Sequence, residues 1–449
     1  MAPRVGVKVA KGDLGFSQCE SCPQGPHFSE FVGDAPIQSG MPEANLVSDG
    51  IHTGRAMRVP LSRKLVYGAR WLPSYAWQRF TRRMPRGEVH LILALADHFE
   101  PSIVPGKGLA RAPRDQQEQR LERWCRDYPE LVRDWRDSEG RPFCHTYFYP
   151  AEQYDQTLIA RLAEHCRGGW GEIEIHLHHG VGSPDTAANT RRALGGFRDV
   201  LASEHGCLSY EDGHGPPRYA FVHGNFALAN SANGRGCGVD NEMQVLAETG
   251  CFADMTLPTG QFHPAQIGKI NSLYECALPL DQRAPQRKGR DLELGRSPQV
   301  FPLIVQGPLS VDFAPAGQRR WAVENGALTG PNPPRLERLR LWKRAAICVQ
   351  GRPDWLFIKL HCHSMNPTQQ AAVLGEPMRQ FLRELVTGAG ERKETLHFVC
   401  GREMVNIILA ACDGREGDPG QFRDYRFQRR RTASLQPHAG EGSQIVLKG

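Results

Sequence analysis

The sequence predicts an α/β protein in which helices cover a parallel sheet or barrel. Three observations lead to this prediction: apolar segments typical of strands alternate with helical segments, the first strand segment is apolar throughout, and polar residues gather where the strand segments end. Alternation of strands and helices favours parallel connections, and strands buried on both faces read as continuous apolar runs. About eight such units in one domain favour closure into a barrel.

The expected elements follow one another in a regular order. Residues 63–80 combine aromatic and basic side chains and are expected to form a helix packed on the domain. The first strand, VHLILALAD at residues 89–97, is followed by a helix at residues 115–128. A strand at residues 143–150 and a helix at residues 156–166 then lead to the strand GEIEIHLHH. The later strands are placed at residues 218–225, 252–258, 299–309, 354–363 and 395–400.

The two ends of the chain differ in composition from its middle. Residues 1–55 are rich in Gly, Pro and Ser and lack a lasting periodicity, which predicts a flexible extension. Charged residues, Gly, Gln and Ser return over residues 414–449, where we expect a disordered tail. The residues between them, 56–413, are predicted to form a single α/β domain.

Charge and cysteine content restrict the class of protein. The formal net charge is +6, with 55 basic and 49 acidic residues, and this small excess without a long basic run does not indicate a nucleic-acid partner. No stretch reaches the roughly 18 apolar residues of a transmembrane helix, and the first residues lack the apolar core of a secretory signal. The 13 scattered cysteines are typical of reduced thiols. We therefore expect a cytoplasmic protein without a transmembrane segment.

Side chains that bind metals or move protons recur where the predicted strands end. In parallel α/β folds the active site lies beyond the carboxyl ends of the strands. Those ends carry Asp97-His98-Phe99-Glu100, His145, His176-Leu177-His178-His179, His223-Gly224-Asn225, Asp254 and His361-Cys362-His363. Asn225 and Asp254 are equally well explained as turn residues that satisfy their own backbone. The recurrence of histidine at several strand ends nevertheless favours a functional site.

The segment GEIEIHLHH places two histidines on one face of its strand. Side chains at i and i+2 point the same way, so His176 and His178 can share a metal ion. A catalytic site keeps about three protein ligands and an open position for water, and His98 is the expected third ligand. Imidazole ligands favour zinc, with nickel or cobalt as alternatives.

The remaining roles follow from the chemistry of a metal-bound water, whose pKa falls from 15.7 to about 7. Asp97, next to the proposed ligand His98, is expected to take the proton of this water. A second group must protonate the leaving atom, and His361 or His363 on a separate strand is the candidate.

The order of these motifs resembles the polysaccharide deacetylase (NodB-type) family of the glycoside hydrolase/deacetylase superfamily, over residues 88–401. In LILALADH the resemblance implies that Asp97 is the catalytic base and that His98 stands in the place of the metal-binding aspartate. In GEIEIHLHH it implies that His176 is the first metal-binding histidine. The family's second histidine stands four residues later, at Gly180 here, so His178 or His179 takes its place.

The later motifs of the family are matched in order. FVHGN, with His223 and Asn225, stands where the family has an arginine-containing strand end. WLFIKLHCH is similar to the family's last motif, a strand that ends in Leu-His, which implies that His361 is the general acid. The resemblance also implies the fold of the family, an irregular (β/α) barrel of the deacetylase type, and a divalent metal cofactor.

The residues and the resemblance together predict a metal-dependent hydrolase that removes an acyl group from an N- or O-acylated carbohydrate, such as a glycan precursor. The side chains expected to contact the sugar are His223, Asn225, Asp254 and His363. One alternative is a glycoside hydrolase on the same barrel, with Asp97 and Asp254 about 5 to 9.5 Å apart across the bond. The other is a non-catalytic carbohydrate-binding or interaction protein. It is favoured because the sequence lacks the metal-binding aspartate and the second histidine of the family pattern.

Overall fold

The computed structural model describes residues 61–85, 87–108, 110–287, 289–313 and 321–430. The predicted extension at residues 1–55 and the final part of the predicted tail, residues 431–449, lie outside these ranges. Within the described ranges, strands form a twelve-stranded sheet and a separate antiparallel pair. The sheet contains β1 (Val89–His98), β2 (His145–Pro150), β3 (Gly171–Leu177), β4 (Ser209–Glu211), β5 (His214–His223), β6 (Cys251–Asp254), β7 (Leu273–Glu275), β8 (Arg290–Asp291), β9 (Leu303–Val305), β12 (Trp355–Cys362), β13 (Glu394–Phe398) and β14 (Phe427–Gln428), and the pair is β10 (Ser310–Asp312) with β11 (Ala322–Glu324).

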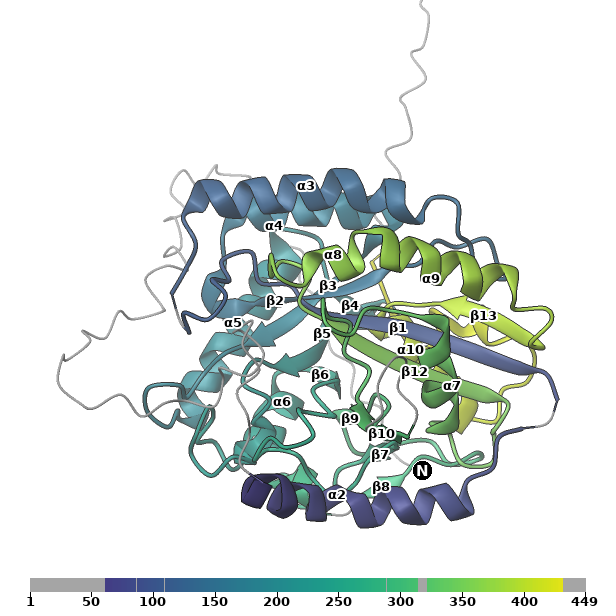
Figure 1. Cartoon of the computed structure of the whole chain (residues 1–449). Helices are drawn as coiled ribbons and strands as arrows, with labels where there is room; N and C mark the ends of the chain where they lie inside the picture. Colours follow the sequence, from purple (N-terminus) through teal and green to yellow (C-terminus); the bar gives the residue numbers. More distant parts are fainter. Residues whose placement is uncertain (1–60, 86, 109, 288, 314–320, 431–449) are drawn as a thin grey trace, which may run out of the picture. The chain divides into compact units, whose positions relative to one another are not determined.

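Helices connect many of these strands (Figure 1). They are α2 (Leu61–Thr81), α3 (Arg114–Val132), α4 (Gln156–His165), α5 (Ala187–Ser203), α6 (Glu242–Glu248), α7 (Leu336–Arg344), α8 (Gln370–Val373), α9 (Glu376–Thr387) and α10 (Gly401–Cys412). In the described part of the chain, no helix combines the length and apolar character that crossing a membrane requires.

The central strands of the sheet run parallel. The main path has the order β12-β1-β2-β3-β5-β6-β9-β7-β8, and β13 also pairs with β1. The pairs from β12 to β9 along this path are all parallel. Each predicted strand segment contains a strand of this sheet, which confirms the α/β class. Because parallel strands end at the same edge, the polar residues after β1, β3, β5 and β12 are brought to one side of the sheet.

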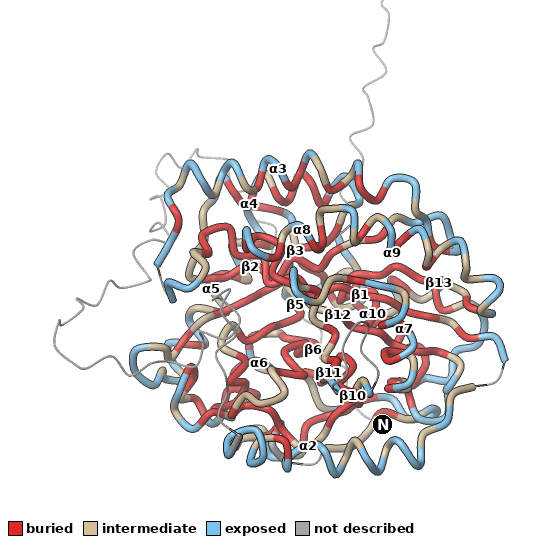
Figure 2. The backbone as a smooth tube through the Cα atoms, viewed as in Figure 1, coloured by how far each residue is buried: buried red, intermediate tan, exposed pale blue. Residues whose placement is uncertain are grey.

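The core lies between the sheet and its covering helices. Figure 2 shows burial along the central strands and exposure on the outer side of α3. In β1 only His90 is partly exposed, as the continuous apolar run predicts for a strand covered on both faces. Every residue of α10 is buried, so this helix is enclosed on all sides.

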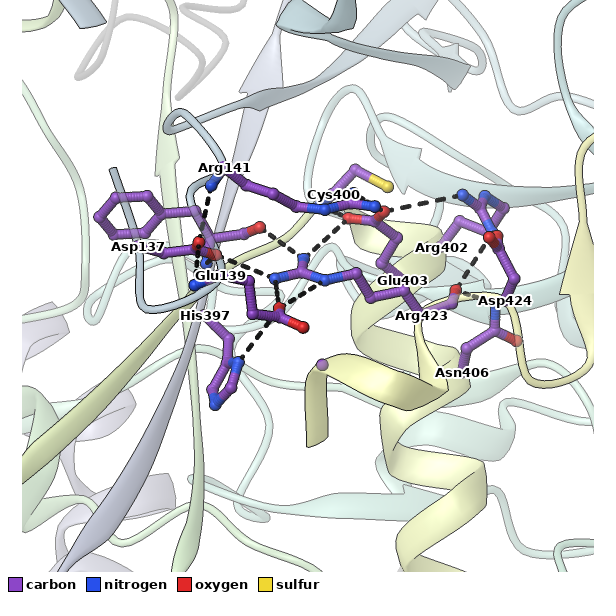
Figure 3. A network of polar contacts seen from close by, with 12 residues as sticks. Asp137, Glu139, Arg141, His397, Cys400, Arg402, Glu403, Asn406, Arg423 and Asp424 are labelled. Atoms are coloured by element: carbon purple, nitrogen blue, oxygen red, sulfur yellow. Dashed lines mark hydrogen bonds and ion pairs between the residues drawn. The ribbon is translucent and has the colours of Figure 1, made fainter. Parts of the chain in front are cut away.

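The residues that enclose α10 include some that the sequence places in the C-terminal tail. Residues 414–430 are packed against the domain, whereas the sequence places them in a disordered tail. Phe427 is fully buried, and its backbone N–H donates to Asn406 Oδ1 on α10 at 2.8 Å. Arg423 donates to Asp137 Oδ2 at 2.9 Å and to the carbonyl of Phe398 at 2.7 Å (Figure 3). Hydrophobic periodicity misses this segment because much of its anchoring is polar.

The first described helix, α2, is packed as the sequence predicts. Trp71 is fully buried and donates from Nε1 to the carbonyl of Gln261 at 3.0 Å. Gln78 Nε2 donates to the carbonyl of Ile270 at 2.8 Å. These bonds attach α2 to the segment between β6 and β7, while Trp77 and Phe80 face solvent.

Candidate metal centre

Five side chains from the ends of three strands converge into one group, here called the Glu100 cluster. Its members are His98 and Glu100 at the end of β1, His176 and His178 at the end of β3, and His363 after β12. Glu100 Oε1 lies 3.3 Å from His176 Nε2 and 3.7 Å from His178 Nε2. The ring centroid of His98 lies 4.4 Å from that of His363 and 4.8 Å from that of His176. Buried His and Glu side chains of this cluster can therefore hold a metal ion.

Hydrogen bonds outside the cluster fix the orientation of two imidazole rings. His176 Nδ1 lies 2.8 Å from the carbonyl oxygen of Val222, which can only accept, so Nδ1 carries the hydrogen. His178 Nδ1 lies 2.7 Å from Oε1 of Glu152, whose other oxygen accepts the backbone N–H of His178. Both rings consequently direct Nε2 toward Glu100, as in metal sites where a carboxylate or carbonyl orients the ligating histidine.

Two imidazole nitrogens of the cluster lack hydrogen-bond partners. His176 Nε2 and His98 Nδ1 are buried and lack a hydrogen-bond partner, although buried polar atoms are normally paired. With its hydrogen on Nδ1, His176 presents a lone pair at Nε2 to the carboxylate oxygen of Glu100, 3.3 Å away. Two electron-rich atoms at this distance require a shared cation, either an extra proton or a metal ion. The donor set fits a divalent metal.

The charges of the cluster agree with this fit. Burial raises the pKa of Glu100, but the neighbouring imidazoles of His176 and His178 outweigh it, and the net pKa lies below the ordinary value. Burial, followed by the neighbouring histidines, holds the pKa of His98 well below its usual value. Burial lowers the pKa of His178, but Glu152 and Glu100 bring it to about 9. The cluster thus combines a carboxylate anion at Glu100, a neutral imidazole at His98 and a protonated imidazole at His178, which would release its proton on binding a metal ion.

Glu100 is the member of the cluster to which sequence reasoning assigned no role. A signal for it exists, because Glu100 follows His98 by two residues and side chains at i and i+2 extend to the same side of an extended chain.

Asp97, which the sequence predicts as the base, lies in a different group of side chains from the Glu100 cluster. Successive side chains of a strand point to opposite faces, so Asp97 and His98 diverge. Asp97 is fully buried, accepts the backbone N–H of Ser364 at 2.9 Å and lies 3.0 Å from His145 Nδ1. It is grouped with His145 and Cys362 instead.

His361 and His363 extend to the same side of β12, because Cys362 between them faces Asp97. His363 belongs to the Glu100 cluster, and His361 is half-buried beside it. Burial, together with the charges of Lys359 and His363, holds the pKa of His361 well below its ordinary value.

The other residues expected to contact a sugar are not members of the Glu100 cluster and have other partners. Asp254 is fully buried and accepts from the hydroxyl of Thr256 at 2.7 Å. Asn225 Nδ2 donates to the carbonyls of His179 at 3.1 Å and Gly236 at 3.3 Å, so it has a structural role in its loop. His223 faces Glu242 on α6 at 3.6 Å.

His178 and His179 point in different directions. His178 faces Glu100, whereas His179 turns away to Asp185 and Glu242. At Gly180, φ is +64° and a Cβ atom would lie 1.9 Å from the carbonyl oxygen of Cys237. No side chain fits there without moving the backbone.

Comparisons with known proteins give a single distant likeness. No protein-family model matches the chain, and no curated protein sequence matches it. A crystal structure of a protein from Mycobacterium smegmatis, provisionally assigned as a polysaccharide deacetylase, matches over 68% of this chain and 86% of its own, with 14% identity and a TM-score of 0.29. This similarity is too low to carry an argument about function.

Proposed function

We propose that this chain is a metal-dependent hydrolase of the deacetylase type, which removes an acyl group from an N- or O-acylated carbohydrate. One observation carries the proposal: the Nε2 lone pair of His176 faces the carboxylate of Glu100 at 3.3 Å, while Nδ1 donates to a backbone carbonyl. A divalent ion satisfies both atoms, and His178 directs its Nε2 to the same carboxylate at 3.7 Å.

The ligands in this proposal are Glu100, His176 and His178, with His98 and His363 beside them. Zinc suits this set of imidazole and carboxylate ligands, and nickel or cobalt are alternatives. When bound, such an ion acidifies a water molecule and polarises an acyl carbonyl. Glu152 and the carbonyl of Val222 orient the two imidazoles and hold their hydrogens at Nδ1.

His361 is the proposed proton carrier. Its half-buried imidazole lies on the side of β12 that also carries His363. A neutral imidazole there can accept a proton from the attacking water and return it to the leaving oxygen or nitrogen of the sugar. Asp97 acts in this proposal as a positioning residue, because its carboxylate holds the backbone of Ser364, next to His363.

The fold proposed for this activity is the irregular barrel of the family. Contacts between β12 and the segments after β6 and β9 support closure. Lys359 on β12 donates from Nζ to the carbonyl of Leu257 at 2.6 Å, and a Cβ atom at Gly307 would lie 2.4 Å from the carbonyl oxygen of Lys359.

The glycoside hydrolase alternative gains no support from its proposed carboxylate pair. Asp97 and Asp254 are both fully buried and engaged by internal hydrogen bonds. The non-catalytic alternative is tested by the same experiment as the hydrolase proposal.

The test compares the metal content and the acyl-sugar hydrolysis of the full chain with those of His176→Ala and Glu100→Gln. The control is His205→Ala, a buried histidine outside the cluster whose Nε2 contacts the hydroxyl of Tyr154 at 3.2 Å. We expect each cluster variant to lose one metal equivalent and the release of acetate from acetylated sugars, and the control to retain both. Unchanged metal content in both cluster variants would overturn the site. Metal binding without hydrolysis of any acylated sugar would favour the binding-protein alternative.

A further inference from the structure

A second group of potential metal ligands lies outside the Glu100 cluster. It contains His179 after β3, His223 at the end of β5, Cys237 in the following loop and Glu242 at the start of α6, and is called here the Cys237 cluster. All four side chains are buried, and one ligand atom from each lies within 4.8 Å of the others. Glu242 Oε1 is 2.9 Å from His179 Nε2 and 3.6 Å from His223 Nε2, and Glu242 Oε2 is 3.6 Å from Cys237 Sγ.

We propose that the Cys237 cluster binds a structural transition-metal ion of the zinc class, separate from the ion of the Glu100 cluster. Two imidazoles, one thiolate and one carboxylate would supply four protein ligands, and four protein ligands with no open position are typical of structural rather than catalytic zinc. The inference goes beyond the proposed hydrolase and does not depend on it.

The surroundings of the ligands resemble those that orient metal-binding side chains. His179 Nδ1 lies 2.9 Å from Asp185 Oδ2, which also accepts the hydroxyl of Thr190, and this pairing directs Nε2 into the cluster. Cys237 Sγ accepts the backbone N–H of Val239 at 3.4 Å, an interaction that stabilises a thiolate. Glu242 Oε2 accepts the backbone N–H of Ala229 at 2.6 Å, so Oε1 remains directed at the two imidazoles.

His223 supplies an independent indication of a ligand. Its ring is fully buried, and Nε2 faces the cluster without a hydrogen-bond partner. Nδ1 accepts the N–H of Asn225 at 3.1 Å, so the hydrogen of the neutral ring stands on Nε2. His223 would bind a metal ion through Nε2 only if this hydrogen moved to Nδ1, in which case the Asn225 amide would lose its acceptor. Binding also releases the thiol proton of Cys237 and the extra proton shared between His179 and Glu242.

The loop that carries Cys237 is shaped to place its sulfur. Gly236 and Gly238 on either side have φ values of +69° and +98°, which favour glycine. A Cβ atom at Gly238 would lie 2.5 Å from Pro184, so the loop packs directly on the segment that follows His179.

A metal ion bound by the Cys237 cluster would restrain residues that pack against the Glu100 cluster. Gly224, next to His223, lies against the ring of His178, where a Cβ atom would come within 2.4 Å. Phe226, two residues further on, packs on His98 with ring centroids 5.5 Å apart. The Cys237 cluster therefore joins the loop after β5 to the end of β3, beside the proposed catalytic ligands.

The test is a cobalt titration of the full chain after removal of its metals with a chelator. Cobalt bound to a thiolate gives a charge-transfer absorption in the near ultraviolet, which a site of histidine and carboxylate ligands lacks. We expect this band in the parent protein, its loss in Cys237→Ser, and its retention in His176→Ala. The matched control is Cys362→Ser, another buried cysteine with neighbouring Asp and His side chains, which should retain the band.

Absence of the band in the parent, or its persistence in Cys237→Ser, would overturn the proposal. X-ray absorption of zinc-loaded His176→Ala provides a measurement that does not require the cysteine variant to fold. One sulfur ligand per zinc at about 2.3 Å is expected, and a zinc shell without sulfur would overturn the site. The two proposals can fail separately. A parent protein that shows the thiolate band but binds no metal at the Glu100 cluster contradicts only the hydrolase proposal. A parent protein that binds metal at the Glu100 cluster but lacks the band contradicts only the structural site.

Discussion

Nδ1 of His178 lies 2.7 Å from Oε1 of Glu152, a residue of the short turn that follows β2. The same carboxylate accepts the backbone N–H of His178 through its second oxygen at 3.2 Å. Glu152 therefore fixes both the ring and the backbone of a proposed ligand from a neighbouring strand, and it contributes to the raised pKa of His178.

Substitution Glu152→Gln should lower the affinity of the Glu100 cluster for zinc by about 10- to 100-fold, because the oriented hydrogen bond to the ligand weakens. Competition with a chromophoric chelator measures the affinity. Glu204→Gln, at an exposed glutamate that accepts from Tyr154, is the control and should leave the affinity unchanged. Equal affinities in both variants would contradict the role of Glu152.

Asp97→Asn should destabilise the fold while leaving the metal in place. An amide cannot accept both the Ser364 N–H and the bond from His145, so we expect a loss of about 1.5–3 kcal/mol in the free energy of unfolding. Urea unfolding and elemental analysis measure the two quantities. Loss of hydrolysis by several orders of magnitude with unchanged stability would instead restore Asp97 as the base.

Arg423→Met should destabilise the domain by about 3–5 kcal/mol, because it leaves Asp137 buried without its cation. The denaturant midpoint measures this change. Arg415→Met, at an exposed arginine of the same segment, is the control and should leave the midpoint unchanged. A similar small effect of both substitutions would show that residues 414–430 do not stabilise the fold.

Glu172 links stability to acid pH through its ion pair with Arg402, 2.8 Å away. Burial raises the pKa of Glu172, but the charges of Arg402 and Arg429 outweigh it and lower the pKa to about 2 from the ordinary 4.5. A carboxylate whose folded pKa is depressed stabilises the protein above its unfolded pKa, and this contribution disappears as the pH falls. The stability difference between the parent and Glu172→Gln should therefore be constant near neutral pH and shrink between pH 4.5 and 2. A difference independent of pH over this interval would contradict the ionic origin of the effect.

The sequence predicts the strands well because their signal is local. A buried parallel strand such as β1 needs an apolar run, and that run is visible without knowledge of its partners. The pairing of His176 and His178 is equally local, since it follows from the alternation of side chains along β3.

The parts that escaped prediction depend on contacts distant in the chain. Cys237 and Glu242 join His179 only because the loop after β5 folds back on the end of β3. The packing of Arg423 depends on Asp137 and Glu139, far earlier in the sequence. The direction of Asp97 is a different case, because the alternation rule that places His176 and His178 together also separates Asp97 from His98.

The position of β1 has a consequence for how the protein is made. This strand is synthesised long before two of its three partners, β12 and β13, which lie near the end of the described chain. Until the ribosome has delivered residue 362, this apolar strand has one whole edge and half of the other available to any neighbouring peptide, and the half edge stays open until residue 398. Nascent chains of this protein should accordingly depend on chaperones that shield such edges, and shortening the chain before β13 should yield aggregates rather than a smaller folded unit.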